Sequence, residues 1–268
     1  MSASSSTAPA RALRAAAGAF LCLGLAAAAQ DPAPPPPPAE LAADATNVLA
    51  AVSARYAAVT NLSCTVRREM RTGGSSAGET VSRVVWARGG RLNVQALAPA
   101  EKRTVIDGVS VWSAAKGDKP SARAVAEQNP VQAANLFSVP ASPEERLAPL
   151  DPATASEIVP PAAPFARQIA LRPRSAPAEA AAAATIVSFD AEGRVVRLEA
   201  FADESRTALL ATLSFESPVE AVSGAWLFGR EVFETAIDGR PVRTVSRFDR
   251  LRVNEELPPS VFDPKAFF

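Results

Sequence analysis

Few side chains in this sequence could carry out chemistry, and their spacing fits no common catalytic or metal-binding arrangement. The 268-residue chain has no histidine and only two cysteines, Cys22 and Cys64. Without histidine it lacks the commonest general base and the commonest metal ligand, and it cannot form a triad built on histidine. Two cysteines alone do not supply the ligands of a zinc, copper or haem site. The sequence therefore predicts no catalytic residue, no metal and no cofactor.

The remaining reactive groups fit structural roles. Glu144-Glu145 and Glu255-Glu256 are adjacent carboxylates, and neighbours in a strand point to opposite faces, so we interpret both pairs as solvated surface. Asp190 and Glu192 belong to a turn that lacks the ligand spacing of a calcium loop. Cys64 lies in the strand-like run LSCTV and is interpreted as a small buried apolar residue. A reactive or intermolecular thiol is the alternative.

The first 29 residues have the pattern of a secretory signal peptide. Arg11 and Arg14 precede an apolar run at 15–29, which ends in the small residues Ala27-Ala28-Ala29. The run is too short to span a membrane, and no later apolar run approaches the required ~20 residues. An uncleaved anchor is one alternative. Lipidation at Cys22 is another, although Leu21 fits the small residue expected there poorly. We expect a periplasmic or secreted protein.

Residues 30–268 form the expected mature chain. Without Arg11 and Arg14 the chain has 26 basic and 28 acidic residues, so no strong attraction to nucleic acid or anionic membrane is expected. Only Cys64 remains, which cannot form an intramolecular disulfide, and we expect a monomer. Residues 30–38 contain the run PPPPP and are predicted to form an extended linker.

An amphipathic helix and a series of short strands follow. Residues 39–59 place Leu41, Ala45, Val48, Leu49, Val52 and Tyr56 at helical spacing. Eleven segments rich in β-branched residues and bounded by Gly, Pro or Asp-Gly are then predicted as strands. Their short connections favour an antiparallel meander. These segments are 62–71, 79–88, 92–97, 103–106, 109–112, 165–172, 185–190, 195–202, 207–216, 226–237 and 241–253.

Residues 114–164 interrupt this pattern. They are polar and rich in proline, and we predict an irregular insertion or lid, with a short helix at Val131–Phe137 and one helical turn near Glu144–Leu147. A smaller insertion rich in Ala and Pro is predicted at 174–184. Because no second domain boundary is visible, the strands on both sides of the interruption are expected to belong to one sheet in a single domain, 39–268.

The order of motifs resembles the LolA-like periplasmic lipoprotein carriers and lipoprotein-sorting proteins. The segment Val84–Trp112 contains Arg88-Gly89-Gly90-Arg91, Pro99 and Asp107-Gly108-Val109-Ser110-Val111-Trp112, and the chain ends with Asn254-Glu255-Glu256-Leu257-Pro258-Pro259-Ser260-Val261-Phe262. The family's usual Arg-Pro turn is Arg88-Gly89 here. The resemblance implies a mainly β, α+β fold: an open antiparallel half-barrel of about ten to eleven strands wrapped around an N-terminal helix and a short helical lid.

The resemblance also implies a ligand. An apolar half-barrel cavity would hold acyl chains of lipids or lipoproteins, since burial stabilises each CH₂ by ~0.8 kcal/mol. Arg88 matches the family's latch, which bonds to the lid. The alternative is a charged strand end in water. The expected lining residues, for which ordinary core packing is an equally good interpretation, are Val84, Trp86, Leu92, Val94, Ile106, Trp112, Leu213, Phe215 and Phe228.

Two functions therefore remain open from the sequence. The first is a periplasmic carrier of lipid or lipoprotein acyl chains. The second is a non-carrier envelope sensor or protein-interaction module on the same fold, with an envelope membrane protein as its partner. Fold alone does not decide between them. An apolar cavity would favour a carrier, and a barrel filled with side chains would favour an interaction role.

Overall fold

The structure is a computed structural model that describes residues 39–125, 139–174, 182–222 and 224–268. The predicted signal peptide, the linker at 30–38 and the predicted helix at Val131–Phe137 lie outside the described residues. Within these residues, two helices and two 3₁₀ turns accompany thirteen strands. The helices are α2 (Ala39–Tyr56) and α4 (Glu144–Leu147), and the 3₁₀ turns are η2 (Pro259–Phe262) and η3 (Pro264–Ala266).

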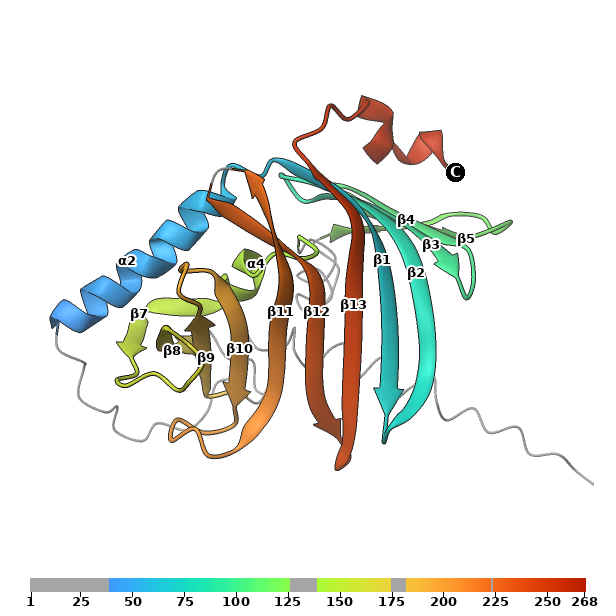
Figure 1. The fold of residues 1–268 in the computed structure, drawn as a ribbon. Helices are drawn as coiled ribbons and strands as arrows, with labels where there is room; N and C mark the ends of the chain where they lie inside the picture. Colours follow the sequence, from blue (N-terminus) through green and yellow to red (C-terminus); the bar gives the residue numbers. More distant parts are fainter. Residues whose placement is uncertain (1–38, 126–138, 175–181, 223) are drawn as a thin grey trace, which may run out of the picture.

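All thirteen strands belong to one open antiparallel sheet (Figure 1). The first six are β1 (Asn61–Thr72), β2 (Ser75–Ala87), β3 (Arg91–Ala98), β4 (Lys102–Asp107), β5 (Ser110–Ala115) and β6 (Ser121–Ala124). The others are β7 (Leu150–Glu157), β8 (Arg167–Pro173), β9 (Ala184–Phe189), β10 (Val195–Phe201), β11 (Leu209–Val222), β12 (Ala225–Ile237) and β13 (Arg240–Val253). The mainly β, open half-barrel fold expected from the sequence is confirmed.

The strand order places the middle of the chain across the open side of the sheet. The order is β6-β5-β4-β3-β2-β1-β13-β12-β11-β10-β9-β8-β7, so consecutive strands are neighbours except β6 and β7. The first and last strands pair at the centre, with Arg67 opposite Arg247. Strands β6 and β7 form the two outer edges. The segment that connects them must therefore cross from one edge to the other, and α4 lies in this crossing segment (Figure 1).

Helix α2 packs on the left half of the sheet, mainly against β7 (Figure 1). Its buried side chains Ala45, Leu49, Val52 and Tyr56 recur every three or four residues, so they form one apolar stripe. The predicted amphipathic helix is confirmed and ends at Tyr56, a few residues earlier than predicted. One continuous core joins this stripe to the sheet and to Val139, Ala141, Leu147 and Leu150 of the crossing segment.

Asn254 ties the end of β13 to the connection between α2 and β1. Its backbone has φ 55°, a conformation that Asn tolerates better than most residues. The side-chain Oδ1 accepts from the Thr60 N–H (2.8 Å) and hydroxyl (2.9 Å), and Nδ2 donates to the Ala58 carbonyl (2.9 Å). The terminal motif noted in the sequence therefore fixes where the chain leaves the sheet.

Beyond Asn254 the chain turns back over β3 and β4 (Figure 1). Asn93 donates from Nδ2 to the Val261 carbonyl (2.7 Å), and the buried Phe262 ring lies 5.2 Å from the Arg91 guanidinium. Phe267 stacks under Arg103 at 4.1 Å. These cation–π contacts hold the C-terminal turns η2 and η3 on the sheet.

Two strands were missed in the interruption at 114–164. Strand β6 has the sequence SARA and β7 has LDPATASE, and neither shows apolar alternation or many β-branched residues. Both lie at sheet edges, where one side needs no partner, and both are held by long-range pairing that local sequence does not encode. The predicted helical turn is α4, at Glu144–Leu147 as expected.

Candidate functional site

A cavity of about 350 Å³ lies where α2, α4, β7 and β8 meet. Its wall includes four apolar side chains from these elements, Leu49, Leu147, Leu150 and Leu171, all of which are buried. Its volume is at the lower end of the range for small-molecule sites. The lining is mixed: Arg88, Glu144, Glu145 and Arg174 also border it.

The crossing segment at 139–149, which we call the plug, closes the half-barrel beside this cavity. Its residues Val139, Ala141 and Ser142 are buried. The Phe228 N–H of β12 donates to the Ala141 carbonyl at 2.9 Å. The hydroxyl of Ser142 accepts from the Glu144 N–H at 3.3 Å, just before α4. The plug is therefore held by its apolar residues and by a small number of polar contacts.

Arg88, the predicted latch, bonds to the end of α2. Its Nε donates to the Val59 carbonyl (2.8 Å) and its Nη2 to the Tyr56 carbonyl (2.5 Å). A cation at a helix C-terminus is favourable because the last carbonyls lack partners within the helix. No hydrogen bond joins Arg88 to a plug carbonyl among the described residues. Arg88 nevertheless lies near α4, because its positive charge acts to lower the pKa values of Glu144 and Glu145 against the larger, opposite effect of burial.

The two adjacent glutamates border the cavity, and our interpretation of them as solvated surface was wrong. They lie on the helical turn α4, where neighbouring side chains can border one space, and each is half-buried. Burial and, to a smaller extent, the neighbouring Glu144 carboxylate raise the pKa of Glu145 to about 7, although the positive charges of Arg146 and Arg88 oppose the rise. Burial likewise raises the pKa of Glu144. No hydrogen bond or ion pair involves either carboxylate among the described residues.

A second charged group lies under the plug, on the concave face. Glu231 of β12 is buried, and burial raises its pKa, while Arg146, Arg68 and the Ala141 N–H act in the opposite direction. Arg146 of α4 approaches the Glu231 carboxylate at 4.0 Å. Sequence analysis missed this contact because a glutamate in a strand has the same pattern whether it is solvated or covered.

Arg68 of β1 faces the same hollow. Its Nε donates to the Ser246 hydroxyl at 3.2 Å, and Ser246 pairs with Glu231 across β12 and β13. The side chain is accessible to solvent, yet the surrounding protein lowers its pKa by desolvation. Arg68 is therefore the solvent-accessible member of the polar group around the buried Glu231 carboxyl.

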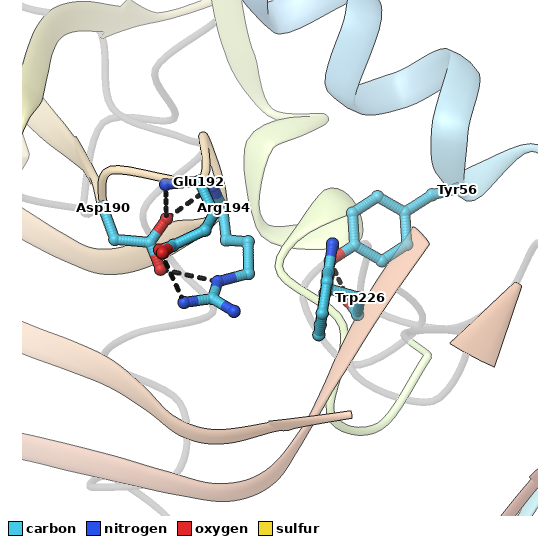
Figure 2. Close-up of polar contacts among 5 residues, drawn as sticks. All are labelled: Tyr56, Asp190, Glu192, Arg194 and Trp226. Atoms are coloured by element: carbon cyan, nitrogen blue, oxygen red, sulfur yellow. Dashed lines mark hydrogen bonds and ion pairs between the residues drawn. The ribbon is translucent and has the colours of Figure 1, made fainter. Parts of the chain in front are cut away.

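Figure 2 shows how the end of α2 is fixed to the left half of the sheet. The Tyr56 hydroxyl donates to the Trp226 carbonyl, and burial raises the pKa of Tyr56. The Arg194 guanidinium lies 4.8 Å from the centre of the Trp226 ring and pairs with Asp190 (2.6 Å) and Glu192 (2.8 Å). The turn predicted at Asp190–Glu192 is thus a structural link.

Eight of the nine predicted lining residues, all except Trp112, belong to the apolar core or pack against it, and none of the nine borders the cavity. Seven are buried: Val84, Trp86, Leu92, Ile106, Leu213, Phe215 and Phe228. Val94 and Trp112 are half-buried. The rings of Phe215 and Phe228 lie 5.3 Å apart. Of the predicted site residues only Arg88 borders the cavity, and the role of the other nine stays a prediction.

Cys64 is buried, as interpreted from the sequence, and burial together with the charges of Glu231 and Asp249 raises its pKa to about 12. The described residues include no group of three or more His, Cys, Asp and Glu side chains placed to hold a metal ion. None of the described helices has the length and apolarity needed to cross a membrane.

The fold is similar to several solved structures at low sequence identity. A Vibrio parahaemolyticus domain described as an outer membrane lipoprotein-sorting protein shares 14% identity, with 84% of this chain and 98% of that chain covered and a TM-score of 0.59. A DUF1329 family protein from Desulfovibrio piger shares 12%, with 85% and 99% covered and a TM-score of 0.58. A LolA superfamily protein from Nitrosomonas europaea shares 11%, with 82% and 98% covered and a TM-score of 0.54.

No protein-family model and no curated protein matches the sequence. The structural likeness covers nearly the whole of each solved chain, so it concerns the half-barrel as a unit and not one hairpin. The chain has a LolA-like fold, which confirms the resemblance inferred from its motifs at the level of the fold.

Proposed function

We propose, from this LolA-like fold, that the protein is a periplasmic carrier, without enzymatic activity, that binds acyl chains of lipids or lipoproteins. In this proposal the chains occupy the concave face where the plug now packs. The observation that carries it is the continuity of the core: the plug residues Val139, Ala141 and Leu147 pack in the same apolar cluster as Trp86, Leu213 and Phe228. Displacing the plug would expose apolar surface suited to hydrocarbon.

The construction of the plug supports this exchange. The plug contributes no strand to the sheet. It can therefore move away from the concave face without breaking any strand pairing. Its described polar contacts with the rest of the protein include the Phe228–Ala141 hydrogen bond, the bond from Ala141 to Glu231, the hydrogen bond from the Arg174 N–H to the Pro149 carbonyl (2.9 Å), and the 4.0 Å approach of Arg146 to Glu231. The acyl chains would then cover the apolar surface of the sheet that the plug had buried.

The proposal is tested by native mass spectrometry of the full chain purified from a bacterial periplasm, followed by displacement of a fluorescent fatty-acid probe. We expect co-purified lipid masses and competition by long-chain but not short-chain fatty acids. Leu147→Ala weakens plug packing, so less binding energy is spent on moving the plug and probe affinity should rise about fivefold. Leu209→Ala, which alters an exposed leucine, is the matched control.

Absence of lipid in the purified protein, together with no probe binding by either the native chain or Leu147→Ala, would contradict a carrier. That outcome would favour the non-carrier envelope sensor or interaction module, in which the packed concave face has only a structural role.

A further inference from the structure

The cavity beside the plug has charges of both signs on its wall. Glu144 and Glu145 border it from α4, and Arg88 and Arg174 border it from the ends of β2 and β8. The four groups are formally neutral together. Leu49 and Leu171, both buried, form part of the apolar wall.

These opposite charges do not pair with one another. No ion pair within 4.0 Å joins any of the four among the described residues. The described side-chain hydrogen bonds of the two arginines go to carbonyl oxygens: Arg88 donates to the end of α2, and Arg174 donates from Nε to the Leu150 carbonyl (2.8 Å). Arg88 is nevertheless close enough to lower the pKa values of both glutamates. The cavity therefore separates opposite charges that attract across it.

Keeping half-buried opposite charges apart costs free energy, whereas charges on an exposed protein surface remain hydrated. Half-buried carboxylates lose hydration, and raised pKa values at Glu144 and Glu145 report that loss. A ligand with a positive and a negative group would satisfy both sides at once. A simple anion would be repelled by the glutamates, and a simple cation by the arginines, so the charge pattern discriminates against both.

We propose that this cavity binds a zwitterionic headgroup, with an ammonium held by Glu144 and Glu145 and a phosphate held by Arg88 and Arg174. The inference rests on the proposed acyl-chain carrier and names the class of amphiphile that it takes. Arg174 suits the phosphate because its described side-chain hydrogen bond uses only Nε, which leaves its two Nη groups to donate parallel hydrogen bonds to phosphate oxygens. Arg88, which is bonded through Nε and Nη2, would add its charge and its Nη1 donor. Leu147 and Leu171 would contact the first part of the acyl chains as they leave the headgroup for the concave face.

The test compares lipids with identical short acyl chains, below their micelle concentrations, by isothermal titration calorimetry on the full chain. The three ligands are a phosphoethanolamine lipid, a phosphoglycerol lipid that lacks the ammonium, and an uncharged diacylglycerol. We expect the phosphoethanolamine lipid to bind about tenfold more tightly than the phosphoglycerol lipid. Glu144→Gln/Glu145→Gln should abolish that preference and leave diacylglycerol binding unchanged.

Two further variants locate the phosphate. Arg174→Gln should weaken both phosphate-bearing lipids about tenfold and leave the diacylglycerol unaffected. Glu256→Gln, at an exposed glutamate outside the cavity, should change nothing. Equal affinity of the native chain for all three ligands would overturn the headgroup inference and leave the carrier proposal standing. Failure of all three ligands, diacylglycerol included, would contradict the carrier, and the headgroup inference with it.

Discussion

The junction at residues 56–61 and the plug at 139–149 both hold segments against the sheet, but they do so by opposite means. At the junction two side chains pair backbone groups that lack partners in the helix: Arg88 donates to the Tyr56 and Val59 carbonyls. Asn254 donates to the Ala58 carbonyl and accepts from the Thr60 N–H. In the plug the described polar contacts are few, and Glu144 and Glu145 lack described partners. Dense hydrogen bonding fixes the junction, whereas the plug depends on apolar burial that another apolar group could replace.

The largest effect is expected from breaking the junction. Asn254→Ala removes the side-chain bonds to Thr60 and Ala58. It also places alanine, which tolerates a positive φ less well than asparagine, at φ 55°. Because the bonds are solvent-exposed, we expect a loss of about 2–3 kcal/mol in the free energy of unfolding, measured by urea denaturation. Asn254→Gly keeps the backbone conformation and should lose about 1 kcal/mol less. Equal losses in both variants would rule out a contribution from backbone strain.

A smaller effect is expected from the charge of the plug. The pKa of Glu145 rises from its ordinary value of 4.5 to about 7 on folding, so the folded chain binds more protons than the unfolded chain between these values. Stability should therefore fall as pH rises from 4.5 through 7. Since the side chain is partly exposed, the loss should be about 1–2 kcal/mol.

The check is urea denaturation at pH 5 and pH 8 of the native chain and of Glu145→Gln. The groups that face Glu145 are Glu144, Arg146 and Arg88, and all three remain in the variant. Glu145→Gln should flatten the pH dependence and be the more stable protein at pH 8. An unchanged pH dependence would show that Glu145 does not lose its hydration in the folded state.

The smallest effect on global stability is expected from the plug's apolar anchor. Leu147→Ala in a fixed core would cost about 2–5 kcal/mol, but the loss here cannot exceed the free energy of docking the plug. We expect less than about 1 kcal/mol, with faster hydrogen exchange at 139–149 and unchanged exchange in β1 and β13. Leu198→Ala, at a residue that is 1% exposed in β10, should show the full core cost. A comparable cost in both variants would mean that the plug is part of the fixed core.

The sequence was sufficient for the elements whose local pattern matches their packing. Eleven strands and helix α2 were predicted because their apolar spacing matches the face that they bury. Strands β6 and β7 were missed because their Ser, Ala and Pro residues carry no such pattern and their pairing is non-local.

The candidate site was predicted less well, for a physical reason. Arg88 was identified through its motif, but the cavity is formed by segments distant in sequence, so Glu144 and Glu145 had the pattern of solvated surface. Glu231 likewise appears in sequence as an ordinary strand glutamate. Its burial depends on the plug that crosses above it, and only the strand order requires that crossing.

The central pairing of the first strand with the last also governs how the chain can fold. During synthesis from the N-terminus, one edge of β1 has no hydrogen-bonding partner until β13, the final strand, has been made. Pairings between such distant segments form slowly, and until they form an unpaired strand edge can pair with other chains and aggregate. β1 carries Arg67, Arg68, Glu69 and Arg71 in succession along its length. These charges disfavour pairing of the unpaired strand with other chains.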